Sequence, residues 1–326
     1  MQSISGRLLA ALAHPRSPHD FLELVKPLHS AHEVRARVES VVCETHDVAT
    51  LLLRTNARWR GHRAGQHVLL TAEIGGVRRT RCFSVASAEG DDVVALTVKA
   101  KPGGRVTPAI VSGALAGKIV SLSQASGEFT LPNPVPQRIL LLSGGSGITP
   151  VMSMLRTLRA RRWDGEISFV HYARSNDDVI YAAELQRLRA EVRIGHFRAA
   201  HLQERDVDTW ACGPPPFLDA VRAVISPERL RVERYTLGAT TGSSEGEITF
   251  ARSGKTAKGR GPLLAIAERA GLSPESGCRM GICKTCVCRK VSGVTRDLRT
   301  GAISAEADVD VQLCVNEPVG PVEIDL

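Results

Sequence analysis

Four cysteines in the last fifty residues have types and spacing that suit redox chemistry. Three of them are separated by four and by two residues, and the fourth follows on a later segment. This is the ligand spacing of one class of [2Fe–2S] cluster, in which four thiolates hold two irons. Gly277 and Gly281 belong to the same loop, and glycine reaches positive φ angles at no side-chain cost, so the backbone can curl around a cluster. The predicted iron ligands are Cys278, Cys283, Cys286 and Cys314.

Structural zinc and disulfides are the alternatives for these cysteines. Zinc sites usually pair two short cysteine knuckles, whereas Cys314 has no second cysteine beside it. The N-terminus shows no long apolar run that ends in a cleavage site, so a secretory signal is not indicated. Cys288 breaks the spacing, and we expect it to be a small buried residue rather than a ligand. Iron–sulfur chemistry is the favoured interpretation.

About the last eighty residues resemble the plant-type ferredoxin family on this cysteine pattern. A tetrapeptide further upstream, Arg81-Cys82-Phe83-Ser84, resembles the R-x-Y-S flavin motif of the ferredoxin–NADP reductase family. The resemblance implies that Arg81 binds the flavin phosphate, Phe83 stacks on the isoalloxazine ring and Ser84 hydrogen-bonds flavin N5. Phe83 replaces the usual tyrosine, so stacking is kept and a hydroxyl contact to the ribityl chain is lost.

A second segment, Lys101-Pro102-Gly103-Gly104-Arg105-Val106-Thr107, suits a pyrophosphate. Its glycines let backbone N–H groups approach phosphate oxygens, and Thr107 can add a hydroxyl donor. Together with residues 126–129 it resembles the FAD branch of the family more than the FMN branch. We therefore predict FAD, with FMN as the alternative, held here by Gly104, Val106 and Thr107.

Residues 138–150 combine an apolar strand-like run with a glycine-rich turn and the start of a helix. Such a turn presents N–H groups and the positive end of a helix to a pyrophosphate, and the strand–turn–helix context is what makes the motif specific. Pro150 is placed where the first turn of a helix tolerates proline. The predicted nucleotide-binding residues are Gly144, Gly145, Gly147 and Thr149.

A later block, Cys212-Gly213-Pro214-Pro215, resembles the C-G-P-P signature of the same reductases. The resemblance places Cys212 beside the nicotinamide ring, with Gly213 and Pro214, and makes Cys212 and Ser84 the residues of hydride transfer. Arg174 follows the second strand of this domain, where the adenosine ribose is expected; this favours NADPH over NADH. Tyr235 is the aromatic residue that the resemblance places over the flavin.

The hydrophobic pattern predicts the elements that must position these residues. Short alternating segments between Glu33 and Asn133 indicate an antiparallel β-barrel, and alternating strands and helices after it indicate a doubly wound parallel α/β domain. The last domain is expected to have the β-grasp fold of ferredoxins. The predicted boundaries are 1–32 for an N-terminal arm, 33–135 for the flavin barrel, 136–237 for the NAD(P) domain, 238–246 for a flexible linker and 247–326 for the ferredoxin domain.

Composition limits the class of protein. The chain has 326 residues and a net charge of +8, yet its arginines are scattered and aromatic residues are few, so nucleic-acid binding is not indicated. No apolar run approaches the roughly 20 residues of a membrane span. We expect a cytoplasmic protein without a transmembrane segment, able to act at the inner membrane face.

These patterns predict an electron-transfer reductase that uses NAD(P)H, FAD and a [2Fe–2S] cluster to reduce an external acceptor. The arm, with Phe21-Leu22-Glu23-Leu24-Val25, looks like reductases paired with membrane acyl-desaturases, so a fatty-acyl desaturase is the expected acceptor. The reductase component of a ring-hydroxylating, alkane or other oxygenase is the alternative. A redox-sensing iron–sulfur protein is the second alternative.

Overall fold

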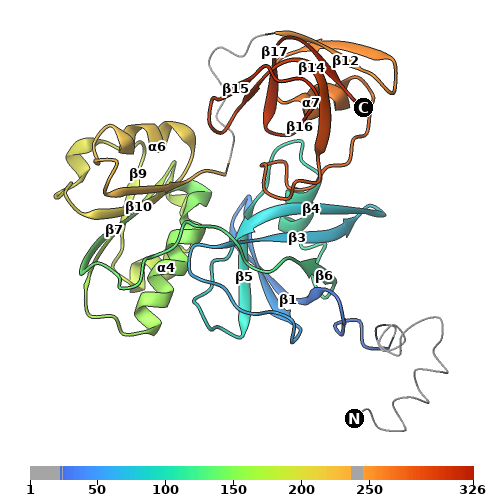
Figure 1. Cartoon of the computed structure of the whole chain (residues 1–326). Coiled ribbons are helices and arrows are strands. Elements are labelled where there is room, and N and C mark those ends of the chain that lie inside the picture. The colour runs from blue at the N-terminus through green and yellow to red at the C-terminus, as the bar shows by residue number, and fades with distance from the viewer. Residues whose placement is uncertain (1–22, 24, 236–244) are drawn as a thin grey trace, which may run out of the picture. The chain divides into compact units, whose positions relative to one another are not determined.

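The computed structural model describes residue 23, residues 25–235 and residues 245–326. The chain forms two compact units, Met1–Glu233 and Arg234–Leu326 (Figure 1). Most of the predicted arm and most of the predicted linker lie outside the described residues. Among the helices that the structure describes, none is both long and apolar enough to span a membrane.

The first unit begins with a six-stranded antiparallel sheet in the order β4-β3-β6-β1-β2-β5. Alternate residues at the start of β1 are buried, where Val34, Ala36 and Val38 enter the core. A bridge between Val85 and Leu96 joins the end of β4 to β5, the two edges of the sheet, and closes the predicted barrel. The strands are β1 (Val34–Thr45), β2 (Val48–Thr55), β3 (His67–Ile74), β4 (Val77–Ser84), β5 (Val93–Lys99) and β6 (Ile119–Leu122).

Strand β4 carries the Arg-x-Phe-Ser tetrapeptide, although the sequence pattern does not predict this strand. Its residues before Ser84 are all exposed or half-buried, so there is no apolar alternation to detect. It pairs with β3 in a register that places Ser84 opposite His67. Helix α3 (Val106–Val111) packs two of its residues, Val106 and Ile110, into the barrel core.

A parallel sheet in the order β11-β10-β7-β8-β9 completes the first unit. Its central strands are apolar and buried, as expected for parallel strands that are covered on both faces. Helix α6 packs Phe217 and Leu218 against one face. The elements are β7 (Arg138–Gly144), α4 (Ile148–Ala160), β8 (Glu166–Ala173), α5 (Ala182–Arg187), β9 (Glu191–Ile194), β10 (Asp208–Cys212), α6 (Pro215–Arg222) and β11 (Leu230–Glu233).

Helix α4 joins the parallel sheet to the barrel (Figure 1). Ser153 Oγ donates to the Ser87 carbonyl at 2.6 Å, and the Glu89 N–H donates to Thr157 Oγ1 at 2.9 Å. Both bonds run from α4 to the loop that precedes β5. The two sheets of the first unit are therefore held together by polar contacts as well as by packing.

The second unit is a mixed sheet in the order β13-β12-β17-β14-β15, with β16 paired to β14. Strands β12 and β17 run parallel and the other pairs antiparallel. Helix α7 buries Leu263, Leu264 and Ile266 against this sheet, which is the predicted β-grasp arrangement. The elements are β12 (Gly246–Phe250), β13 (Lys255–Gly259), α7 (Leu263–Arg269), β14 (Val287–Asp297), β15 (Ile303–Ser304), β16 (Val309–Gln312) and β17 (Asn316–Ile324).

Candidate functional site

The cysteine loop before β14 aims backbone donors at its own sulfurs. The N–H groups of Met280, Ile282 and Cys283 lie 3.3–3.4 Å from Cys278 Sγ. The Cys278 N–H donates to Cys283 Sγ at 3.2 Å, and Thr285 Oγ1 donates to the same sulfur at 3.2 Å. Donors directed at a sulfur favour its thiolate form, which is the form that binds metal.

Cys314 meets Cys286 in the interior of the second unit. The Leu313 N–H donates to the Cys286 carbonyl at 3.0 Å, and this bond fixes the segment of Cys314 beside the loop. A hydrogen bond from the Cys314 thiol lowers the pKa of Cys286 to about 6, while the same pairing and burial raise the pKa of Cys314. Cys278, Cys286 and Cys314 are each 3% exposed. Four sulfurs gathered in this way, with N–H donors directed at them, fit a [2Fe–2S] cluster.

Two glycines allow this loop to form. A Cβ at Gly277 would lie 2.7 Å from Cys283 Sγ. Gly281 has a φ of +75°, and a Cβ there would lie 2.6 Å from Arg299 Nη1. Cys288 lies on β14 instead, where its Sγ contacts the Asp325 carbonyl at 3.2 Å, away from the four predicted ligands.

The flavin tetrapeptide lies at the end of β4. The Arg81 guanidinium donates to the Thr80 carbonyl at 2.7 Å, and Phe83 is half-buried against the barrel core. Ser84 is 4% exposed, and its hydroxyl donates to Glu233 Oε2 at 3.3 Å. The hydroxyl predicted to face flavin N5 is therefore already tied to a carboxyl of the nucleotide-binding sheet.

Glu233 belongs to this site, although its sequence context does not single it out. It ends β11, where it is the Cα partner of Cys212 on β10. Burial raises the pKa of Glu233 to about 7, against the opposing effect of the Ser84 hydrogen bond. Its Oε1 lies 3.9 Å from Nδ1 of His67, whose pKa is lowered by burial. The only signal in the sequence is that Glu233 lies two residues before the aromatic residue predicted to cover the flavin, Tyr235.

The predicted pyrophosphate segment forms a tight turn before α3. The Lys101 N–H donates to Thr107 Oγ1 at 2.8 Å, which leaves the Thr107 hydroxyl proton available to another acceptor. A Cβ at Gly104 would lie 2.9 Å from the Lys101 carbonyl oxygen. Val106 is buried in the barrel core, so its backbone, rather than its side chain, is what it can offer a phosphate.

The glycine-rich turn and the C-G-P-P segment are packed against each other. A Cβ at Gly147 would lie 2.3 Å from the Cys212 carbonyl oxygen, and one at Gly144 would lie 3.2 Å from a ring atom of Pro214. Thr149 is buried, and its hydroxyl donates to the Ser146 carbonyl at 3.3 Å. The structure thus brings together Gly144, Gly145, Gly147, Thr149, Cys212, Gly213 and Pro214.

Arg174 forms an ion pair with Asp178, an acidic residue that the sequence patterns do not single out. The guanidinium is 75% exposed and pairs with Asp178 Oδ1 at 3.2 Å. Ser175 Oγ donates to the other oxygen of that carboxylate at 3.0 Å and, with Arg174, lowers the pKa of Asp178. Tyr235 is half-buried and belongs to the second unit.

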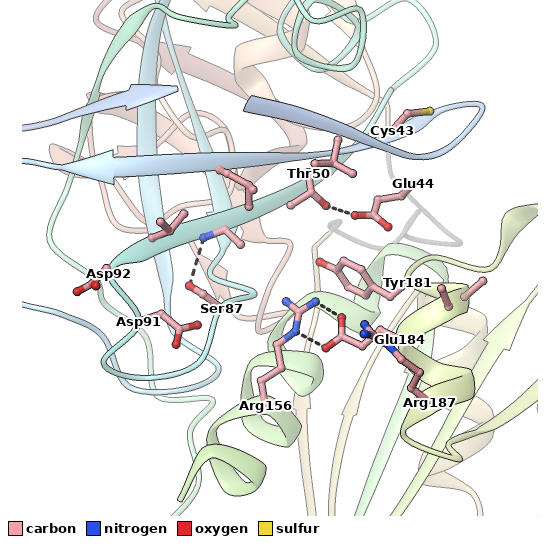
Figure 2. Close-up of a pocket in the computed structure, with 16 residues that line it drawn as sticks. Cys43, Glu44, Thr50, Ser87, Asp91, Asp92, Arg156, Tyr181, Glu184 and Arg187 are labelled. Atoms are coloured by element: carbon pink, nitrogen blue, oxygen red, sulfur yellow. Dashed lines mark hydrogen bonds and ion pairs between the residues drawn. The ribbon is translucent and has the colours of Figure 1, made fainter. Parts of the chain in front are cut away.

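A pocket of about 820 Å³ lies between the barrel and helices α4 and α5 (Figure 2). None of the predicted cofactor residues lines it. Arg156 spans this region: it pairs with Glu184 at 2.9 Å, donates to the Ala86 carbonyl at 2.6 Å and lies over the Tyr181 ring at 4.6 Å. These contacts hold the barrel against the nucleotide-binding sheet. We therefore interpret the pocket as part of the packing interface between these two parts of the first unit.

Three family models match the chain in succession. The oxidoreductase FAD-binding domain matches residues 35–131, the oxidoreductase NAD-binding domain residues 141–214 and the 2Fe-2S iron-sulfur cluster binding domain residues 249–315. Together with the folds of the two units, these matches define a flavoprotein reductase with its own iron–sulfur domain. The zinc, disulfide and FMN alternatives are set aside on these matches.

Curated relatives place the chain within this class. An NADPH oxidoreductase of Mycobacterium tuberculosis is 37% identical over 98% of this chain and 91% of its own length. The chain belongs to the family of NAD(P)H-dependent oxidoreductases with FAD and [2Fe–2S] domains, and it is an electron-transfer reductase. The glycine betaine monooxygenase reductase subunit of Chromohalobacter salexigens is 26% identical over 90% of this chain and 95% of its own length. The structure of phthalate dioxygenase reductase shares the fold, with a TM-score of 0.64 at 20% identity, over 90% of this chain and 98% of that chain.

Proposed function

We propose that this protein takes hydride from NADPH and delivers the electrons, through its [2Fe–2S] domain, to an oxygenase. One observation carries the internal part of this proposal. Ser84, the proposed flavin-facing residue, and Cys212, the proposed nicotinamide-facing residue, both adjoin Glu233, the first by a hydrogen bond of 3.3 Å and the second as its strand partner. A hydride donor and a flavin held by these two residues would lie close together, as hydride transfer requires.

Each group of residues has a distinct task in this proposal. Bound FAD supplies the conversion of one hydride into two single electrons, whereas the protein binds and orients. Arg81 and the turn at Gly104 neutralise the FAD phosphates, and Phe83 covers the ring. The turn at Gly147 holds the nucleotide pyrophosphate, while Glu233 keeps a proton beside Ser84.

An oxygenase is proposed as the acceptor because several relatives that are named by their acceptor are reductases of monooxygenases. The glycine betaine monooxygenase reductase subunit aligns over nearly the whole chain. The fatty-acyl desaturase expected from the N-terminal arm has no support among these relatives, and most of that arm lies outside the described residues. NADPH is proposed over NADH because of Arg174 and the name of the mycobacterial relative. The domain limits of the sequence analysis, including the linker at 238–246, are kept as part of the proposal.

Two experiments test the two halves of the proposal. An anaerobic absorbance titration with NADPH, repeated with NADH, should bleach the flavin and the iron–sulfur bands together, with NADPH effective at lower concentration. A flavin that bleaches beside a cluster that stays oxidised would overturn the internal path. Product formation should then be measured with a purified glycine betaine oxygenase component and, separately, with membranes that contain an acyl desaturase. Turnover with the desaturase alone would overturn the proposed acceptor.

A further inference from the structure

The carbonyl of Gly281, in the cysteine loop, is held by side chains from outside the loop. Arg299 Nη1 donates to the Gly281 oxygen at 3.3 Å, and Gln312 Nε2 donates to the same oxygen at 3.0 Å. Arg299 belongs to the turn between β14 and β15, and Gln312 ends β16. The sheet of the second unit thus fixes the direction of one carbonyl in the loop.

The N–H of the same peptide group, that of Ile282, faces a cysteine. It lies 3.3 Å from Sγ of Cys278, one of the proposed iron ligands. The peptide is trans, and a trans peptide is planar, so its C=O and N–H groups point in opposite directions. Donors that hold the carbonyl on one side therefore hold the N–H toward the sulfur on the other. A hydrogen-bonded carbonyl also polarises its amide, which strengthens the N–H as a donor.

Arg299 is itself fixed by a carboxylate and by the backbone. Its Nη2 and Nε atoms lie 2.6 and 3.1 Å from the two carboxylate oxygens of Asp297. The Leu298 N–H donates to the Val315 carbonyl at 2.8 Å, which ties the turn to the segment of the fourth proposed ligand. A Cβ at Gly281 would lie 2.6 Å from Arg299 Nη1, so a side chain there would displace the guanidinium. The arginine forms an ion pair with Asp297 and acts on the loop through its hydrogen bond.

We propose that Arg299 and Gln312 are positioning residues that set the reduction potential of the [2Fe–2S] cluster through the Gly281–Ile282 peptide. Reduction adds one negative charge to the cluster, and N–H groups directed at its sulfurs stabilise that charge. An N–H that these two side chains hold toward Cys278 Sγ makes the cluster easier to reduce. The inference deepens the proposed function and rests on its ligand set, because Cys278 is a proposed ligand.

The test is a dye-mediated redox titration of the full-length holoprotein with dithionite, followed by the electron paramagnetic resonance signal of the reduced cluster. The first variant is Gln312→Leu, which removes a donor and no charge. At the midpoint potential of the wild type, it should lower the ratio of reduced to oxidised cluster by about threefold to tenfold, as expected for loss of one hydrogen bond. A tenfold change corresponds to about 59 mV for one electron.

The Arg299 donor is removed together with its counter-ion, in the double variant Asp297→Asn/Arg299→Met, so that the net charge is unchanged. The ratio should again fall by about threefold to tenfold. The matched control is Asp325→Asn/Arg252→Met. Arg252 forms the same bidentate pair with Asp325, at 2.8 and 2.5 Å, in the turn after β12, and the ratio in this control should equal that of the wild type.

The combined variant, with Gln312→Leu added to the double variant, separates positioning from independent effects. Both side chains hold one carbonyl, so the ratio should fall by more than the product of the two separate effects, because the peptide is then free to turn. Three outcomes would overturn the inference: an unchanged ratio in either variant, an equal fall in the Arg252 control, or effects that simply multiply.

Bound iron and visible absorbance check that each variant carries a full cluster, and Gln312→Met replaces Gln312→Leu if the latter loses iron. Dithionite supplies the electrons in this titration, so the result stands even if the proposed electron path fails. A cluster that shows the expected shifts with dithionite and that NADPH does not reduce would count against the proposed function only.

Discussion

Glu233 shows how much one side chain depends on its surroundings. Its pKa is raised to about 7 because burial penalises the carboxylate more than the Ser84 hydrogen bond favours it. A glutamate with an ordinary pKa would place a full negative charge beside the proposed flavin site and would oppose its reduction. A half-protonated glutamate at neutral pH imposes less of this charge.

This pKa has a consequence for stability. The folded protein binds more protons than the unfolded chain between pH 4.5 and about 7, so Glu233 costs stability progressively as pH rises through that range. Glu233→Gln should therefore raise the free energy of unfolding at pH 8 by up to about 3 kcal/mol and should have little effect below pH 4.5. Urea unfolding followed by tryptophan fluorescence would measure this in the first unit, which holds all three tryptophans. An equal effect at both pH values would contradict it.

The proposed cluster ligands lead to a second prediction about single side chains. Cys283→Ser should lose nearly all cluster absorbance and bound iron, because three thiolates and a hydroxyl hold the two irons poorly. Cys288→Ser is the matched control, since Cys288 Sγ contacts the Asp325 carbonyl and should be dispensable for the cluster. Iron analysis and visible absorbance decide the outcome. Equal loss of iron in both variants would remove Cys283 from the ligand set.

The glycine-rich turn between β7 and α4 lies very close to the backbone at the end of β10. The space beside Gly147 is filled by the Cys212 carbonyl, at 2.3 Å from where a Cβ would lie. The glycine-rich turn and the end of β10 are therefore packed tightly against each other. A change in the turn should alter the position of the segment proposed to face the nicotinamide as well as the proposed binding of phosphate.

Gly147→Ala should raise the KM for NADPH by about tenfold or more, because relief of such an overlap costs about 1–3 kcal/mol. Ser146→Ala is the control, since the Ser146 contact to Thr149 uses the backbone carbonyl and survives the change. Steady-state reduction of ferricyanide measures both variants. A KM in Gly147→Ala equal to that of the control would show that the close approach is unimportant for binding.

Arg174, in the loop after β8, leads to a prediction about the choice between NADPH and NADH. The Arg174 guanidinium is paired with Asp178 Oδ1 at 3.2 Å, so the carboxylate competes with any phosphate for the guanidinium. Arg174→Ala should raise the KM for NADPH by about fivefold to tenfold, as expected for loss of an exposed charge-assisted contact, and should leave the KM for NADH unchanged. Asp178→Asn should lower the KM for NADPH. Parallel shifts for both coenzymes would contradict this role.

The two compact units of the molecule hold the residues of two different proposed reactions. The residues proposed for hydride transfer lie in the first unit and the cluster cysteines lie in the second. The two-electron reaction should therefore survive damage to the cluster, whereas transfer to an external protein should not.

Cys283→Ser in the full-length chain should keep NADPH–ferricyanide activity within about twofold of the wild type, because ferricyanide can take electrons directly from a reduced flavin. Reduction of cytochrome c should fall by about tenfold or more, since the cluster is the proposed exit for electrons to a protein acceptor. Cys288→Ser should retain both activities. Undiminished cytochrome c reduction in Cys283→Ser would mean that the flavin is itself an exit.

The amino-acid sequence by itself determines the class of this protein. The C-x4-C-x2-C spacing, the glycine-rich turn and the C-G-P-P segment are local patterns, because the residues proposed to bind each ligand are near neighbours in the chain, and local spacing is what a sequence displays. Strand β4 is not predicted by such a pattern, because a half-exposed edge strand has no apolar alternation. Only the tertiary structure brings Glu233 and His67 to Ser84, because they come from three strands 17 to 166 residues apart in the chain. Their pKa values follow from that burial, which no spacing of residues along the chain encodes.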